Sequence, residues 1–124
     1  MRQLKGWLKL NRSIVNWKHY NDVYVKAVFL HCLIYANSVD GHWNSEDADV
    51  EYGSFISSQR KMAKQLGMST NKLVSCLKIL EKSGELKCEA FFGKYTKITV
   101  NNYAKYQGKQ IDEIFSAEPA EVKV

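Results

Sequence analysis

Four polar side chains recur at helical spacing between positions 71 and 82, and none of them is acidic. In a helix over residues 70–82 they share one face, because positions three and four apart are neighbours on a helix. An amide, a hydroxyl and two ammonium groups offer hydrogen bonds and positive charge, but no nucleophile paired with a base. Such a set is typical of binding to a polyanion rather than of catalysis. The four residues are Asn71, Ser75, Lys78 and Lys82.

The surrounding residues divide into candidates for base edges and candidates for phosphates. A helix in the major groove of DNA presents its N-terminal residues to the bases, and an asparagine can bond adenine through two hydrogen bonds. A lysine ammonium on a flexible side chain is attracted to the charge of a phosphate and does not distinguish one base from another. The base-edge candidates are Thr70, Asn71 and Ser75, with Ser69 in the preceding turn. The phosphate candidates are Lys72, Lys78 and Lys82, then Arg60, Lys61 and Lys64 in the segment before, and Lys87, Lys94 and Lys97 in the segment after.

The distribution of charge supports this interpretation more than the net charge of +5 does. Residues 58–110 contain eleven Lys and Arg against Glu81, Glu85 and Glu89, a formal excess of +8, whereas residues 1–57 are balanced and residues 111–124 are acidic. A concentrated basic region favours polyanions, because neutralised phosphates release their counterions. The alternative is a solvated lysine face that only keeps the domain soluble, since polar residues on an exposed helix face are ordinary.

No pattern in the chain nominates a catalytic, metal or cofactor site. His19, His31 and His42 lack metal-ligand spacing, and a core or boundary role suits His31 beside Cys32. The phosphate-binding and nucleophile motifs GxxxxGK[ST], GxGxxG and GxSxG are missing from the sequence. Three widely spaced cysteines, Cys32, Cys76 and Cys88, suit reduced thiols in apolar surroundings. We therefore expect a protein that is not an enzyme and needs no cofactor.

The residues of the basic region predict two helices followed by a β-hairpin. A helix starting at Ser57 or Ser58 ends at Gly67, which can adopt the left-handed conformation, and Ser69 or Thr70 caps the next helix over 70–82. Ser83 and Gly84 then end that helix. Alternation of apolar and polar residues predicts strands over 85–90 and 95–100, with a turn at 91–94. This order corresponds to a winged helix-turn-helix, an α+β fold with a helical core and a small antiparallel sheet.

The first half of the chain gives weaker signals apart from one helix. Asn21 or Asp22 caps a helix to about Asn37, whose apolar residues recur every three or four positions. Before it, residues 6–10 suggest a short strand and residues 12–20 a helix. Residues 38–50 suggest a polar loop, and residues 51–56 a turn leading to an extended segment that can pair with the hairpin.

The length suits one domain over residues 1–107. The two tyrosines of 103–106 are expected to pack against this domain. Residues 108–124 are expected to form a flexible acidic tail or the start of a linker. No apolar run approaches the roughly 20 residues that cross a bilayer, and the N-terminus has no signal-peptide pattern. We therefore expect a cytoplasmic protein, in a bacterial cell or a phage-infected host, without a membrane partner.

Taken in order, several segments resemble the N-terminal winged-helix domain of phage replisome-organiser and DnaD-like replication initiation proteins. They are residues 6–12, 17–20, 29–37, Trp43, and residues 53–58, 66–69, 77–86 and 95–107. The resemblance implies binding to double-stranded DNA at a replication origin, help in loading the helicase, and self-association. It therefore implies a homo-oligomer, with the replicative helicase or its loader as a further partner.

Two other functions compete with replication initiation. A transcriptional regulator can use the same fold, because a fold alone does not fix a function. The chain can also be an oligomerisation or protein-interaction module with little DNA binding, and the apolar turn at Phe91 and Phe92 favours packing or a subunit contact over insertion between bases.

Overall fold

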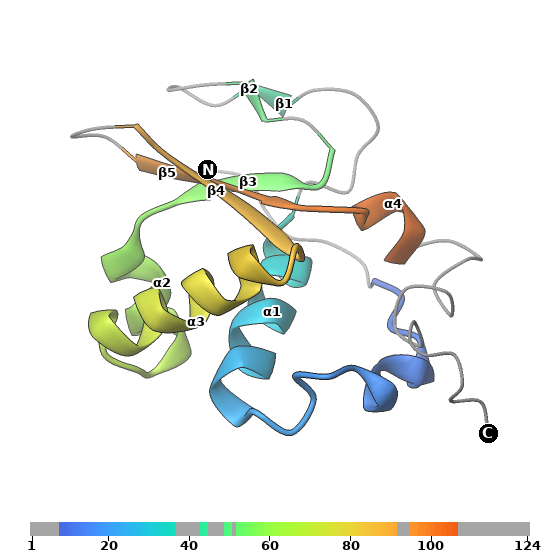
Figure 1. Ribbon diagram of the computed structural model, residues 1–124. Coiled ribbons are helices and arrows are strands. Elements are labelled where there is room, and N and C mark those ends of the chain that lie inside the picture. The colour runs from blue at the N-terminus through green and yellow to red at the C-terminus, as the bar shows by residue number, and fades with distance from the viewer. Residues whose placement is uncertain (1–7, 37–42, 45–48, 51, 92–94, 107–124) are drawn as a thin grey trace.

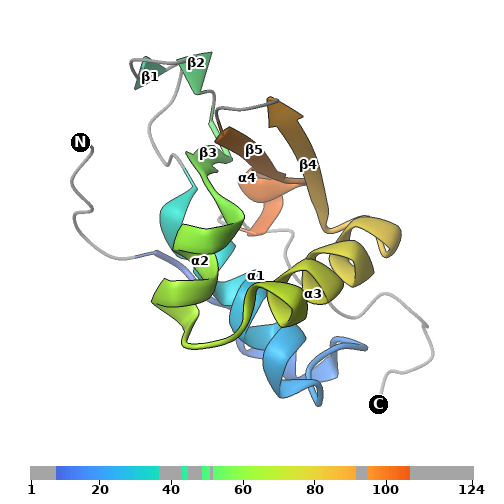
Figure 2. The same ribbon diagram turned by 90° about the vertical axis from the view of Figure 1, so that its left-hand side faces the viewer.

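The computed structural model describes residues 8–36, 43–44, 49–50, 52–91 and 95–106 (Figure 1). The described part is an α+β structure with three helices of eight or more residues and a three-stranded antiparallel sheet. Figures 1 and 2 show the three helices on one side of the sheet. The elements are η1 (Arg12–Asn16), α1 (Val23–Tyr35), β1 (Trp43–Asn44), β2 (Asp49–Val50), β3 (Ser54–Ser57), α2 (Gln59–Leu66), α3 (Thr70–Lys82), β4 (Leu86–Phe91), β5 (Tyr95–Val100) and α4 (Tyr103–Tyr106).

The starts of the three main helices are fixed by side-chain caps, as predicted. Asp22 accepts hydrogen bonds from the first turn of α1, Ser58 accepts one from Lys61 N, and Ser69 accepts one from Lys72 N. Each cap satisfies backbone N–H groups that have no partner within the helix. Between α2 and α3, Gly67 has a φ of 71°, the left-handed conformation expected at this turn. The predicted bounds of α3 are confirmed.

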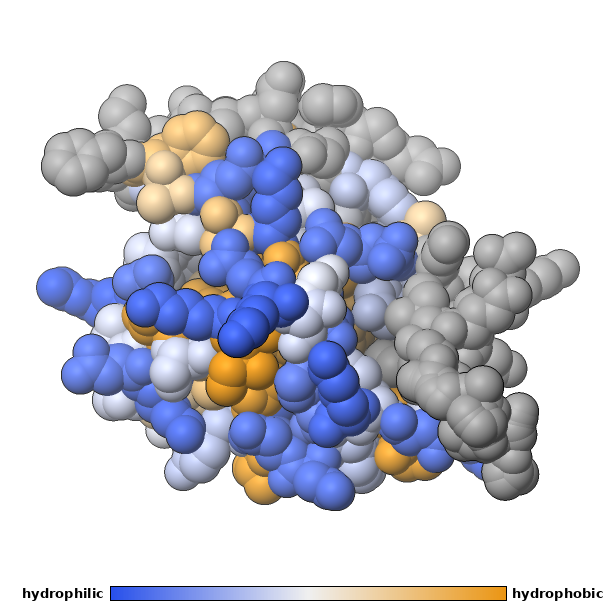
Figure 3. All heavy atoms as spheres, in the orientation of Figure 1, coloured by the Kyte–Doolittle hydropathy of each residue, from blue (hydrophilic) through white to orange (hydrophobic). Residues whose placement is uncertain are grey.

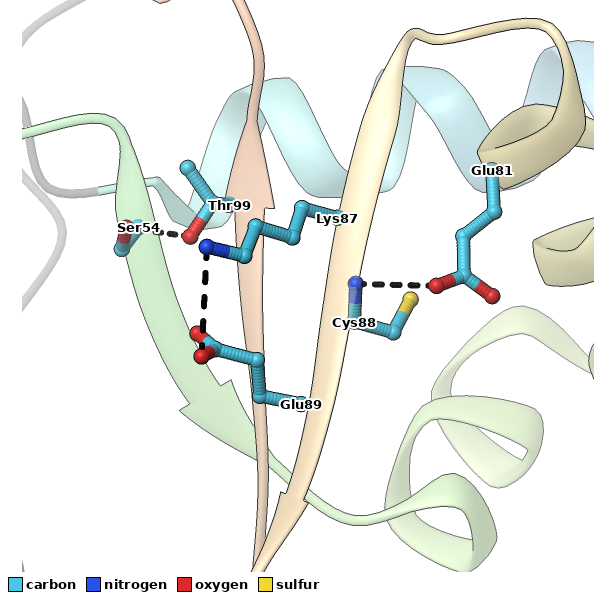
Figure 4. Close-up of polar contacts among 6 residues, drawn as sticks. All are labelled: Ser54, Glu81, Lys87, Cys88, Glu89 and Thr99. Atoms are coloured by element: carbon cyan, nitrogen blue, oxygen red, sulfur yellow. Dashed lines mark hydrogen bonds and ion pairs between the residues drawn. The ribbon is translucent and has the colours of Figure 1, made fainter.

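The sheet has the strand order β3-β5-β4, so the predicted hairpin and the predicted pairing of the extended segment are both confirmed. Leu86, Ile98 and Val100 are buried on the side that faces the helices. The opposite side carries polar contacts, including a hydrogen bond of 2.8 Å between the hydroxyls of Ser54 and Thr99 (Figure 4). The alternation of apolar and polar residues along the strands therefore determines which face of the sheet packs against the core.

The core lies between α1, α3 and the sheet. Apolar residues that recur every three or four positions along α1 and at its C-cap are buried, and they are Val25, Val28, Phe29, Cys32, Leu33 and Ala36. Tyr103 and Tyr106 of α4 are also buried, and the ring of Tyr106 lies 5.5 Å from that of Phe29. The three cysteines are free, and burial, with the nearby Glu81 as a smaller cause, raises the pKa of the Cys88 thiol to about 12.

Three predictions for the first half of the chain are wrong. Residues 8–10 are not a strand, and residues 12–20 form only the 3-10 turn η1, because Trp17 is extended with a ψ of 139° and ends it. Trp17 lies against Phe29 at 4.7 Å between ring centres, so packing against α1 determines its conformation. Within the predicted polar loop, β1 pairs with β2, and Val50 is fully buried. Asn37, Lys94, Phe92 and the predicted tail at 108–124 lie outside the described residues.

Candidate nucleic-acid interface

The polar face predicted for α3 is exposed along the helix. We call its four residues the α3 stripe, and all four are exposed: Asn71, Ser75, Lys78 and Lys82. The opposite face is buried and contains Leu73, Leu77 and Leu80. On the side of the molecule in Figure 3, hydrophilic side chains gather over α2 and α3, with an apolar patch beside them. The predicted polar face is therefore exposed, opposite a buried leucine face of the same helix.

Contacts from both flanks show how the α3 stripe is oriented. On one flank, Lys72 Nζ lies 4.5 Å from the centre of the Tyr24 ring on α1. On the other flank, Glu81 Oε2 accepts a hydrogen bond of 3.2 Å from the backbone N–H of Cys88 on β4 (Figure 4). Because Lys72 and Glu81 project from different sides of α3, the α3 stripe lies between them and faces away from the core. It is therefore accessible as a ridge between α1 and β4.

Two serine hydroxyls at the start of α3 make different hydrogen bonds. Ser69 Oγ accepts from Lys72 N at 3.1 Å, so this side chain caps the helix. Ser75 Oγ donates to the carbonyl oxygen of Lys72 at 2.9 Å. Thr70 and Asn71 are exposed in the first turn, where backbone N–H groups also point outward. Thr70, Asn71 and Ser75, the base-edge candidates, are thus all exposed near the start of α3. The fourth candidate, Ser69, caps the helix, and this role explains its position without a ligand.

The cations predicted on the preceding helix lie on the exposed side of α2. Arg60, Lys61 and Lys64 are exposed, whereas Met62 and Ala63 are buried against the rest of the domain. The helices that carry these cations and the α3 stripe, α2 and α3, pack directly together. The cations can neutralise phosphates on the strands that border a groove.

The hairpin lysines are not joined to the α3 stripe. Lys87 and Lys97 lie on the side of the sheet opposite to the core, and the register sets Lys97 across from Glu89. Lys87 Nζ lies 4.0 Å from Glu89 Oε2, as Figure 4 shows, and this exposed ion pair contributes little to stability. Lys94 lies outside the described residues. Lys87 and Lys97 therefore form a second, mixed-charge surface.

The three acids of the basic region each lie beside a donor or a cation. Glu85 is half-buried, and none of the three belongs to the α3 stripe. The pairs are Glu81 with Cys88 N, Glu85 with Trp17 Nε1 at 2.9 Å, and Glu89 with Lys87. The positive charge on α2 and α3 is thus left without a carboxylate on the ridge itself, which strengthens its attraction for a polyanion.

Sequence patterns did not indicate the roles of two residues that organise this region. Tyr24 positions Lys72 from α1, and Trp17 positions Glu85 from the segment after η1. Both contacts join residues far apart in the chain, so no local periodicity or spacing reports them.

The two described histidines, His19 and His31, contact other side chains of the fold. His31 is 8% exposed and packs its ring against Tyr35, and burial lowers the pKa of His31 below its ordinary value. His19 Nε2 and Ser83 Oγ lie 2.8 Å apart. Within the part of the chain that the structure describes, no three His, Cys, Asp or Glu side chains gather as a metal site would require.

Comparisons with protein-family models, with curated proteins and with solved structures found no match to this chain. Among the described helices, none has the length and apolar character needed to cross a membrane. The function is therefore inferred from the α3 stripe, the flanking cations and the resemblance of the sequence.

Proposed function

We propose that this chain is a non-enzymatic winged-helix module that binds double-stranded DNA. The observation that carries the proposal is the exposed α3 stripe, which combines an amide, a hydroxyl and two ammonium groups and contains no acid. In this mechanism α3 enters the major groove, Asn71 and Ser75 contact base edges, and Lys78 and Lys82 contact phosphates. The cations of α2 hold the adjoining DNA backbone.

The contribution of lysine–phosphate contacts to DNA binding can be measured from the salt dependence of the affinity. Each phosphate neutralised in a DNA complex contributes roughly 0.9 to the slope of log affinity against log salt. The double variant Lys78→Ala/Lys82→Ala should therefore lower the slope by nearly two and weaken binding to every duplex sequence. The measurement is a titration of a labelled duplex, followed by fluorescence anisotropy at several salt concentrations.

The matched control removes the same charge elsewhere. Lys9 and Arg12 are exposed residues before and within η1, so Lys9→Ala/Arg12→Ala changes the net charge equally without touching α2 or α3. This control should keep the salt slope of the unmodified protein. If both double variants lower the slope equally, attraction depends on net charge alone and the α3 stripe is not the binding surface.

We further propose that the DNA bound is a replication origin and that the chain acts in bacterial or phage replication initiation as a homo-oligomer, in contact with the replicative helicase or its loader. This step rests on the resemblance to replisome-organiser and DnaD-like proteins. Footprinting across the source genome should protect an origin region. Protection confined to promoter palindromes would instead identify a transcriptional regulator, because dimeric regulators bind symmetric half-sites.

One observation favours the assembly function as a second candidate. Phe91 at the end of β4 is 41% exposed, and its ring centre lies 4.8 Å from that of Tyr95. An exposed aromatic ring such as that of Phe91 gains free energy when a protein partner covers it. If Phe91→Ser abolished oligomers seen by light scattering while Lys78→Ala/Lys82→Ala left DNA affinity unchanged, assembly would be the main function.

A further inference from the structure

The α3 stripe contains two side chains that can distinguish bases by the direction of a hydrogen bond. Asn71 and Ser75 lie one helical turn apart, a rise of about 6 Å, near the start of α3. Lys78 and Lys82 follow them and can only donate hydrogen bonds. Since a base pair rises about 3.4 Å along DNA, side chains at the separation of Asn71 and Ser75 can meet base pairs one or two steps apart.

The hydroxyl of Ser75 has already used its only hydrogen. Ser75 Oγ donates to the carbonyl oxygen of Lys72 at 2.9 Å, and Ser75 itself is exposed. Its remaining lone pairs can therefore accept hydrogen bonds from a ligand, but the hydroxyl cannot donate without losing the bond to Lys72. In the major groove only adenine N6 and cytosine N4 offer hydrogens, whereas guanine and thymine present acceptors. Ser75 thus matches adenine or cytosine.

Asn71 differs because its amide has both an acceptor and donors. These match the N6 amino group and the N7 acceptor of adenine at the same time. The following residue does not compete for this position, because Lys72 extends toward α1 and lies over the Tyr24 ring at 4.5 Å. The Ser69 hydroxyl, two residues before Asn71, already accepts a hydrogen bond from Lys72 N, and Thr70 between them carries a hydroxyl rather than an amide. Asn71 is therefore the amide that the start of α3 presents outward.

We infer that α3 is specific for two amino groups in the major groove, one or two base pairs apart: that of an adenine, which Asn71 contacts, and that of an adenine or cytosine, which Ser75 contacts. The inference rests on the proposed DNA binding and adds the class of base that the helix selects. Guanine or thymine at the second position would set an acceptor against the acceptor oxygen of Ser75, which is unfavourable.

The first experiment selects preferred duplexes from a random pool with the full chain and then repeats the selection with Asn71→Ala and Ser75→Ala. Each substitution should remove the preference at one position while the remainder of the site is retained, with roughly a tenfold loss of affinity for the preferred duplex. Ser75→Thr is the matched control, because its hydroxyl can also bond the preceding turn and still accept. Lys82→Ala should weaken all duplexes alike.

The second experiment leaves the protein unchanged. Replacing the selected adenine by 7-deazaadenine removes the N7 acceptor but preserves the phosphates and base pairing, so the affinity should fall roughly tenfold at the Asn71 position only. Binding that is salt-dependent but shows no base preference, or a preference kept by both alanine variants, would overturn this inference alone. Absence of salt-dependent binding to any duplex would overturn the proposed function as well.

Discussion

The ammonium of Lys72 lies 4.5 Å from the centre of the Tyr24 ring and joins the first turn of α3 to the first turn of α1. Both residues are exposed, so the contact is a surface cation–π interaction, worth about 0.5–1 kcal/mol. It holds the cation beside the α3 stripe, on the flank where a phosphate would lie if α3 occupied a groove.

Removing the ring while keeping the charge tests this relationship. Tyr24→Leu should weaken duplex binding roughly two- to fivefold, the equivalent of the lost interaction, because Lys72 must then be ordered on binding. The salt slope should not change, since the number of cations is the same. Anisotropy titrations over a range of salt concentrations measure both quantities.

Tyr24→Phe is the control, because it keeps the ring and should bind like the unmodified protein. Lys72→Ala should differ from Tyr24→Leu by lowering the salt slope by nearly one. A gain in affinity for Tyr24→Leu would mean that the ring holds Lys72 away from the phosphate and would contradict the positioning role.

The part of the fold that sequence patterns predicted is the part fixed by local signals. Ser58, Gly67 and Ser69 act on backbone groups within a few residues of themselves, so their types alone locate α2, the turn and α3. The alternation in β4 and β5 likewise reports which residues face the core. The α3 stripe was predictable for the same reason, because it depends only on helical periodicity.

The remainder depends on contacts between distant segments. Trp17 falls in a segment with helical spacing, but its position is determined by Phe29 and Glu85, and Val50 is buried although its neighbours in the sequence are polar. The position of Lys72 over Tyr24 is of this kind too. Tertiary packing overrides local preference at such sites, so spacing alone could not indicate the contacts of Trp17, Val50 and Lys72.

The hydrogen bond from Trp17 Nε1 to Glu85 Oε2, 2.9 Å long, should contribute to stability. The other carboxylate oxygen, Glu85 Oε1, is buried without a hydrogen-bond partner among the described residues. Trp17→Phe keeps an aromatic ring against Phe29 but removes the donor, so it should lower the free energy of unfolding by about 1–3 kcal/mol. Urea unfolding followed by circular dichroism measures the change.

A double-mutant cycle separates the hydrogen bond from packing. Glu85→Leu removes the carboxylate, and in that background Trp17→Phe should cost much less than in the unmodified chain. Equal costs in the two backgrounds would show that Trp17 acts through its ring alone.

Gly53 should be the least replaceable of the three described glycines with a positive φ. Its φ is 85°, and a Cβ added there would lie 2.9 Å from Tyr103 Cβ, which belongs to a buried side chain. Gly53→Ala should therefore destabilise the fold by more than the roughly 1–2 kcal/mol of left-handed strain. Gly84→Ala is the matched control, since its φ is 91° and no atom lies within 4 Å of the added Cβ. Similar losses for both variants, measured by thermal unfolding, would contradict the steric explanation.

His31 should make stability depend on pH. Its side chain is buried beside Tyr35 and Phe55, with ring distances of 4.6 and 6.4 Å, and burial lowers its pKa below the ordinary value of 6.5. As the pH falls below 6.5, the unfolded chain binds a proton at this histidine before the folded chain does. The free energy of unfolding should therefore decrease with falling pH, by at most about 1.4 kcal/mol per pH unit for this group, until the pKa of the folded state is reached.

His31→Phe is the variant that tests the assignment, because it keeps a ring between the same neighbours but cannot bind a proton. Urea unfolding at intervals between pH 5.5 and 7.5 should show a smaller pH dependence for His31→Phe than for the unmodified chain. The range stays above the ordinary pKa values of carboxylates, so their titration contributes little to the difference. If both proteins lose stability equally as the pH falls, His31 does not bind protons differently in the folded and unfolded states, and another group is responsible.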